Sequence, residues 1–338
     1  MGVTIKDVAK KAGISPTTVS LVLNNKSNAR ISEKTRQLVT NAASELNYIP
    51  NSAAVSLVTQ KTRTIGLLLP DDNSYHFASL IHSIEKACKK AGYFLMIGSV
   101  GLEVEDELNY IINFINRGMA GIIFDPSLYP KKLSQKYYEL IAAKDIPIIP
   151  LGSINSNIVA NSILPDFRQG GYLAASHLIE LGHKRIGFFT TGSQFNASSA
   201  IADGFKSALE EWDISFDIDL VYEGMMDTDS GYKCLEKLMK QNITAIFSSS
   251  DIAAYGMYRY AREHHIHIPT DLSIVGFSNM TVSDSLDVPL TSVSFHIDRI
   301  ARKSVNLLKK ISEDKEQALP EIITPDLILR ESTCKIDY

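Results

Sequence analysis

The chain has 338 residues, a formal net charge of −4 and 45% hydrophobic residues. These values exclude a disordered or fibrous protein and predict more than one folded domain. No stretch approaches the roughly 18 apolar residues that a membrane-spanning helix needs. The three cysteines, Cys88, Cys234 and Cys334, are scattered and odd in number, which is typical of reduced thiols and not of a secreted disulfide scaffold.

The first 58 residues predict a small helical domain that begins with two short helices and a tight turn. Thr4 is the expected cap of the first helix, with Asp7 three residues later, and Gly13 suits the left-handed conformation that ends a helix. Ser15 is the expected cap of the second helix, and Pro16 fits its first turn, where no backbone donor is needed. This spacing is typical of a helix-turn-helix motif.

Apolar and polar residues divide the faces of these helices. The inward positions are Val8, Ala9 and Ala12 on the first helix and Val19, Val22 and Leu23 on the second. The outward positions of the second helix are Thr17, Thr18, Ser20 and Leu21, small side chains that fit a DNA major groove. A third helix is expected after Ser32, with Leu38, Ala42 and Leu46 recurring at four-residue spacing. A helical cap without a ligand remains an alternative reading of the pattern alone.

Charge is distributed unevenly along the chain. Residues 1–63 contain nine Lys or Arg and three Asp or Glu, a formal charge of +6, so the remainder carries −10. A basic head attracts phosphate and an acidic body repels it. The asymmetry favours a DNA-binding head.

Segments along nearly the whole chain resemble the LacI/GalR (lactose-repressor) family of bacterial transcription regulators. In the head the resemblance rests on residues 4–24, 32–36 and 46–51, and it continues through residues 63–67, 177–187, 268–277 and 329–332. It implies a lambda-repressor-like, all-α helix-turn-helix head followed by a two-lobed α/β core of the type I periplasmic-binding-protein kind. It also implies a homodimeric regulator, most often a repressor, that binds a pseudo-palindromic operator without a cofactor or metal.

The resemblance assigns domains and DNA contacts. Residues 1–49 would form the DNA-binding domain, 50–62 the hinge helix and linker, and 63–338 the core for effector binding and dimerisation. The expected DNA contacts are Thr4, Ser15, Pro16, Thr17, Thr18, Ser20, Leu21, Asn24, Arg30, Thr35, Tyr48, Asn51, Ala54 and Leu57.

Two of these positions carry most of the expected specificity. Leu57 matches the hinge leucine that the family wedges into the minor groove, where unstacking one base step bends the duplex. A plain linker is the alternative for residues 51–59, and Val55 stands where many relatives carry Arg. Leu21 also replaces an Arg that reads guanine in relatives; it suits a thymine methyl instead, so a different base preference is expected.

After residue 62 short apolar runs alternate with helical spacing, which predicts parallel sheets covered on both faces. Strands are expected at 65–69, 94–97, 121–124, 146–149, 186–189, 245–247 and 273–276, and helices at 79–91, 105–116, 170–181, 203–211 and 253–264. The pattern restarts after residue 160, which predicts two lobes. With the crossovers that the resemblance implies, the lobes are about 63–160 with 291–320, and about 161–290 with 321–333.

Effector contacts are expected in the cleft between the lobes, beyond the carboxyl ends of the strands. They are Asp72, Tyr75, His76, Phe77, Phe124, Asp125, Gly152, Asn196, Ile201, Ser250 and Ser278. Ile201, Ser250 and Ser278 stand where sugar- or purine-binding relatives carry Arg, Asn and Asp, so the cleft loses charged ligand partners. Two alternatives follow: an unusual small-molecule effector, with sugar-related ligands one class, or control by a protein corepressor or by no effector.

Other protein classes find little support. Phosphate-cradling, nucleophile-elbow and zinc-protease motifs are missing from the sequence, so no enzyme is expected. His264, His265 and His267 cluster, but no Cys or acidic ligand follows at metal-finger spacing. A secreted solute-binding protein shares the core fold, yet the N-terminal segment reads as a polar, capped helix and not as a signal peptide. We therefore expect a cytoplasmic protein, associated with the nucleoid when bound to DNA.

Overall fold

The computed structural model describes residues 3–23, 31–49, 62–70, 75–100, 104–125, 146–152, 160–193, 195–314 and 317–336. The chain forms two compact units, Met1–Thr62 and Arg63–Tyr338. Among the described residues, no helix is long and apolar enough to cross a membrane.

The first unit contains α1 (Ile5–Ala12), α2 (Pro16–Leu23) and α3 (Glu33–Glu45). Its small core centres on Val8, Val19 and Val39, one from each helix and all fully buried. The expected inward position Leu38 is wrong: its side chain is 45% exposed, and the neighbouring Val39 takes the core position. Ala42 and Leu46 pack against the core as expected. The four-residue spacing was right for two positions but placed the first on the wrong face.

Helix ends in this unit are set by the residues that the sequence indicated. Gly13 ends α1 with φ 66°, a left-handed conformation that costs glycine little. Ser15 Oγ accepts from the backbone N–H of Thr18 at 3.2 Å, and Ser32 Oγ accepts from that of Thr35 at 3.2 Å. Both serine caps are confirmed.

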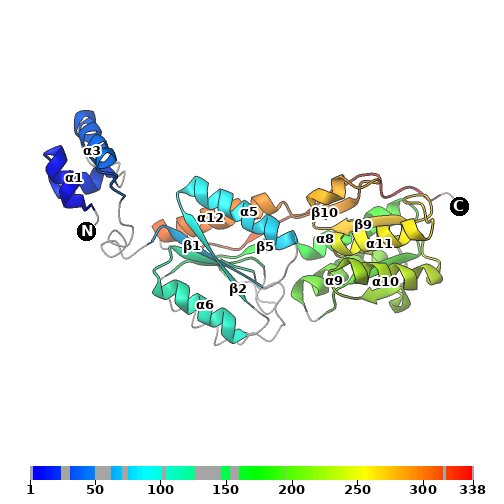
Figure 1. The fold of residues 1–338 in the computed structure, drawn as a ribbon. Coiled ribbons are helices and arrows are strands. Elements are labelled where there is room, and N and C mark those ends of the chain that lie inside the picture. The colour runs from blue at the N-terminus through cyan, green and yellow to red at the C-terminus, as the bar shows by residue number, and fades with distance from the viewer. Residues whose placement is uncertain are drawn as a thin grey trace. The chain divides into compact units, whose positions relative to one another are not determined.

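The first lobe of the second unit has a parallel four-stranded sheet in the order β2-β1-β3-β4. Its strands are β1 (Thr64–Pro70), β2 (Phe94–Val100), β3 (Gly121–Phe124) and β4 (Ile148–Pro150). The helices α5 (Tyr75–Ala91) and α12 (Ile297–Asp314) pack against each other on one face, and α6 (Val104–Asn116) covers the other (Figure 1). Ile65, Leu67 and Ile123 face α5, whereas Leu68 and Ile122 face α6. Burial on both faces explains why these strands read as continuous apolar runs.

The second lobe has a six-stranded sheet in the order β12-β10-β9-β8-β6-β7. Its strands are β6 (Ile186–Thr190), β7 (Val221–Glu223), β8 (Ala245–Ser248), β9 (Ser273–Phe277), β10 (Thr291–Ser294) and β12 (Asp326–Ile328). All neighbours are parallel except β10 and β12. The helices α8 (Phe167–Glu180) and α9 (Asn196–Glu211) cover one face, and α10 (Thr228–Leu238) and α11 (Asp251–Glu263) cover the other (Figure 1). The sequence pattern did not indicate α10, β7, β10 or β12, and the three strands among them have only three or four residues each.

The chain passes between the lobes beside a small two-stranded sheet of β5 (Ile163–Pro165) and β11 (Glu321–Ile323). The expected return to the first lobe at residue 291 is too early. Strand β10 pairs with β9 in the second sheet, and the chain joins the first lobe only with α12. Residues 291–294 therefore belong to the second lobe.

Candidate functional site

The outward face of α2 carries small and uncharged side chains. Pro16 and Thr17 are exposed, and Thr18, Ser20 and Leu21 are partly exposed. Val19 and Val22, on the opposite face of the same helix, are buried in the core of the head. The helix therefore presents a face without long side chains that can approach base edges closely in a major groove.

Hydroxyl groups at the helix starts are arranged in hydrogen-bonded pairs. Ser15 Oγ lies 2.9 Å from Thr18 Oγ1, and Ser32 Oγ lies 2.9 Å from Thr35 Oγ1. In each pair one hydroxyl donates to the other, so one O–H remains to donate elsewhere. A phosphate oxygen at a helix start is a suitable acceptor, because the helix dipole also favours negative charge there.

Thr4 is bound differently from these pairs. Its backbone N–H and its hydroxyl both donate to Asp7 Oδ2, at 2.8 and 2.7 Å. These hydrogen bonds lower the pKa of the Asp7 carboxyl. The Thr4 hydroxyl hydrogen is thus engaged, and Thr4 acts in this structure as a helix cap.

The remaining expected DNA contacts are only partly described. Tyr48 packs partly against the core of the head, so its ring supports the fold of α3. Asn24, Arg30, Asn51, Ala54 and Leu57 lie outside the described residues. Their contacts stay predictions.

Several expected effector contacts lie in the hydrophobic core. Phe77, on α5, is 5% exposed. Phe124, at the end of β3, is 1% exposed beside α6. Ile201, on α9, is 4% exposed where α9 meets α8. The spacing placed these residues near the strand ends, but their side chains turn inward to fill the lobes. In this structure they support the lobes from within. Asp72 lies outside the described residues, as do the side chains of Tyr75 and His76.

The polar expected contacts lie at the ends of strands. Asp125 follows β3, Gly152 follows β4 with φ 118°, and Ser250 precedes α11. Asn196 begins α9, and its buried Oδ1 has no hydrogen-bond partner among the described residues. The hydroxyl of Ser249, which follows β8, is likewise buried and unpartnered.

These two orphaned atoms follow β6 and β8, which are neighbours in the second sheet. Buried polar atoms are nearly always paired, so unpaired ones at adjacent strand ends are typical of a ligand site. The sequence analysis missed Ser249. The signal was its place in the Ser248-Ser249-Ser250 run that follows an apolar strand.

The loop after β9 is held by a buried carboxylate. Asp251 is fully buried and accepts hydrogen bonds from the backbone N–H of Met280 and from the hydroxyls of Ser283 and Ser292, each at 2.7 Å. Burial raises the pKa of its carboxyl. From the other side, Arg330 donates to Asn279 Oδ1 at 2.7 Å. These contacts fix Ser278 and Asn279, which have positive φ values of 109° and 49°, respectively.

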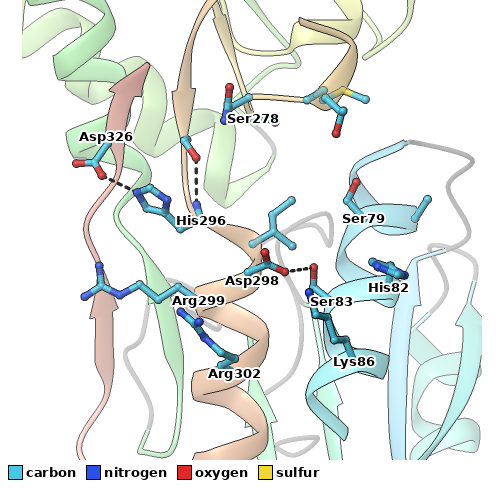
Figure 2. A pocket seen from close by; sticks show the side chains of 16 residues that line it. Ser79, His82, Ser83, Lys86, Ser278, His296, Asp298, Arg299, Arg302 and Asp326 are labelled. Atoms are coloured by element: carbon cyan, nitrogen blue, oxygen red, sulfur yellow. Dashed lines mark hydrogen bonds and ion pairs between the residues drawn. The ribbon is translucent and has the colours of Figure 1, made fainter. Parts of the chain in front are cut away.

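A cavity of about 1010 Å³ lies between this loop, α5 and the start of α12. Among the expected effector contacts that the structure describes, Ser278 lies in its lining. Figure 2 shows the polar side chains that α5 and α12 direct toward it. Ser83 Oγ donates to Asp298 Oδ1 at 2.8 Å, and His296 Nε2 donates to Asp326 Oδ2 at 2.6 Å. The cavity draws its walls from both lobes, since the β9 loop and Asp326 belong to the second and α5 to the first.

A helix-turn-helix head on a two-lobed α/β core, with a cavity lined by both lobes, defines a class of DNA-binding protein that carries its own ligand-binding module. Residues 4–51 match the family model described as "Bacterial regulatory proteins, lacI family", and residues 175–333 match a "Periplasmic binding protein-like domain".

Similar proteins cover the chain from end to end. The "HTH-type transcriptional repressor PurR" of Pasteurella multocida (strain Pm70) is 32% identical over 333 residues, which are 97% of this chain and 98% of the relative. The protein of the same name from Actinobacillus pleuropneumoniae serotype 3 (strain JL03) is 33% identical over 334 residues, with 97% and 98% covered. The crystal structure of the lac repressor dimer bound to operator and the anti-inducer ONPF has a TM-score of 0.85 and 25% identity, covering 99% of this chain and 100% of that one.

The chain belongs to the lacI family of bacterial regulatory proteins and is a DNA-binding transcriptional repressor. The expected fold class, an all-α head with a two-lobed periplasmic-binding-protein-like core, is confirmed.

Proposed function

We propose that two copies of this chain bind one pseudo-palindromic operator, with α2 of each copy in the major groove. The observation that carries the proposal is the outward face of α2, which is free of long side chains beside hydroxyl pairs at two helix starts. The operator's two-fold symmetry would then mirror that of the dimer. Leu57 of each copy would wedge into the minor groove at the operator centre.

The edge of the first sheet supports dimerisation. Strand β2 is the edge strand, and its Phe94, Met96 and Ile97 side chains are 75%, 38% and 49% exposed. An edge strand with large exposed apolar side chains is typical of a protein interface. A second copy of the chain is the proposed occupant, in line with the lac repressor neighbour, which is a dimer on its operator.

A substitution on this strand tests the dimer. We expect Phe94→Glu to convert the dimer into a monomer, because a carboxylate would be buried without a partner. Sedimentation velocity measures the change. Trp212→Glu is the control, since Trp212 is also a large exposed residue, at 49%, but follows α9 in the other lobe. A Phe94→Glu protein that sediments like the parent would rule out β2 as the interface.

The repressor's effector, on this proposal, is an uncharged polar molecule. Asn196 Oδ1 and Ser249 Oγ offer hydrogen bonds at adjacent strand ends, and no charged side chain stands at positions 201 and 278. One solved family member, from Enterococcus faecium, holds bound ribose, which supports a sugar-related ligand. A protein corepressor is the second candidate, favoured by the same loss of charged ligand partners at these positions. The chain would act by binding and not by catalysis, in the cytoplasm and on the nucleoid.

The experiment is a selection of genomic fragments by the purified full chain, at physiological salt without added ligand, followed by sequencing. We expect enrichment of a palindromic motif, and affinity for it should fall steeply with salt as counterions are released. Binding without ligand would favour an inducer over an obligatory corepressor. Enrichment of unrelated fragments without symmetry would overturn the paired-operator proposal.

A further inference from the structure

The cavity between α5, α12 and the β9 loop is basic, although it lies on an acidic body. Lys86 comes from α5, and Arg299 and Arg302 come from successive turns of α12 (Figure 2). We propose that this cavity is a binding site for a small polyanion that carries phosphate groups, apart from the orphaned polar atoms of Asn196 and Ser249, which do not line it.

The cations of the cavity are available to a ligand. Within the described residues, Lys86, Arg299 and Arg302 make no hydrogen bond or ion pair through their side chains. The two carboxylates of the lining are already engaged, Asp298 by the Ser83 hydroxyl and Asp326 by His296. Three permanent cations thus face two occupied carboxylates. The lining therefore attracts an anion.

The chemistry of the lining suits phosphate groups. A guanidinium presents parallel donors that match two phosphate oxygens, and an ammonium adds a compact point charge. Hydroxyl and amide groups of Ser79, Asn279 and Thr281 also line the cavity, where they can pair with ligand hydroxyls. A phosphorylated small molecule with several hydroxyl groups satisfies both sets.

The shape of the site favours a small molecule over a protein segment. Its volume of about 1010 Å³ is at the upper end of small-molecule pockets, which hold roughly 300–1,000 Å³. An acidic protein segment docking on the surface would need the cations but not the hollow. The observations therefore favour the small ligand, and an acidic segment becomes an outcome of the test.

Occupancy would link the two lobes. The cations belong to helices of the first lobe, whereas Asn279, Thr281 and Asp326 belong to the second. A ligand that touches both favours one arrangement of the lobes, and the coupling to any other ligand is reciprocal. The consequence for operator affinity rests on the proposed function; the anion site itself does not.

Calorimetric titration of the full chain with inorganic pyrophosphate at low salt tests the site. We expect the parent to bind pyrophosphate saturably. Arg302→Gln should weaken the affinity roughly tenfold or more, because a charge-assisted contact is lost. The double variant Lys86→Gln/Arg302→Gln should bind more weakly still, because it loses a second such contact. The affinity of Arg302→Lys should lie between those of the parent and Arg302→Gln, since lysine keeps the charge but loses the paired donors of the guanidinium. Lys310→Gln is the matched control: it removes an exposed cation of α12 outside the lining and should bind like the parent.

The outcomes separate the alternatives. Equal weakening by Lys310→Gln, or none by Arg302→Gln, would mean diffuse surface attraction and would overturn the proposal. An absence of saturable binding by the parent protein would also overturn the proposal. Tighter binding of a hexaglutamate peptide than of pyrophosphate, lost in the same variants, would replace the small ligand with an acidic segment. Because the titration contains no DNA, its result stands whether or not the operator proposal holds.

Discussion

The head and the second lobe use the same hydroxyl side chains in opposite surroundings. In the head, Ser15 and Ser32 lie at the surface, and each bonds a threonine at its own helix start. In the second lobe, Ser283 and Ser292 are fully buried and donate to the equally buried Asp251. The first arrangement leaves an O–H for an outside partner, whereas the second uses every donor to hold a loop. The head is therefore built to contact a ligand directly, whereas the lobe is built to position one.

Asp251 gives the largest expected effect. Asp251→Ala leaves three buried donors unpaired, and we expect the free energy of unfolding of the second unit to fall by about 3 kcal/mol or more. Urea denaturation followed by circular dichroism measures it. Asp251→Asn is the matched control: it keeps one acceptor oxygen and should cost less. Equal stability of Asp251→Ala and the parent would show that the network does not hold the loop.

The head has the thinner core, so a small truncation should suffice to weaken it. Val39→Ala removes buried methyl groups from a core with four buried valines, and we expect the head to lose about 2 kcal/mol. Leu38→Ala is the control, because the Leu38 side chain is 45% exposed and its loss should change stability by less than about 0.5 kcal/mol. Methyl NMR of the head during thermal unfolding distinguishes them. If Leu38→Ala destabilised the head more than Val39→Ala, Leu38 would be the buried residue, as the four-residue spacing predicted.

The second lobe should also be the more sensitive to acid. Burial lowers the pKa values of His177 and His183 below the usual 6.5. The unfolded chain therefore binds protons first, so stability is full above pH 6.5 and is lost as pH falls below it. The loss is at most about 1.4 kcal/mol per pH unit for each histidine. Urea midpoints between pH 7 and about pH 5 measure the slope, and His183→Gln should flatten it; an unchanged slope would exclude His183.

The sequence predicted most of the fold but less of the ligand site. Caps such as Ser15 and Ser32 act on the next few residues, so their effect is local and readable. The strands of the first sheet were readable too, since burial on both faces leaves continuous apolar runs. Leu38 failed because two neighbouring apolar residues fit one helix turn and only packing with α1 and α2 chooses between them.

Phe77, Phe124 and Ile201 show a related limit of the sequence, because their burial in the lobes could not be predicted from it. Position along the chain places a residue near a strand end, but the lobes' packing decides whether its side chain points inward. The basic cavity could not be predicted from the sequence either. Lys86 and Arg302 lie more than 200 residues apart and come together only through the packing of α5 and α12. Ser249 shows the same limit, since its hydroxyl counts as orphaned only once its surroundings are known.

If the outward face of α2 reads operator bases, a substitution at Leu21 should change the preferred DNA sequence. The measurement is a parallel selection of random DNA by the parent and by Leu21→Arg, with sequencing of the bound pools. We expect a palindrome from both proteins, with guanine newly preferred at one symmetric pair of positions in the variant, because arginine pairs bidentately with guanine. Identical motifs from the two proteins would show that Leu21 faces away from the bases and that α2 does not read the operator through it.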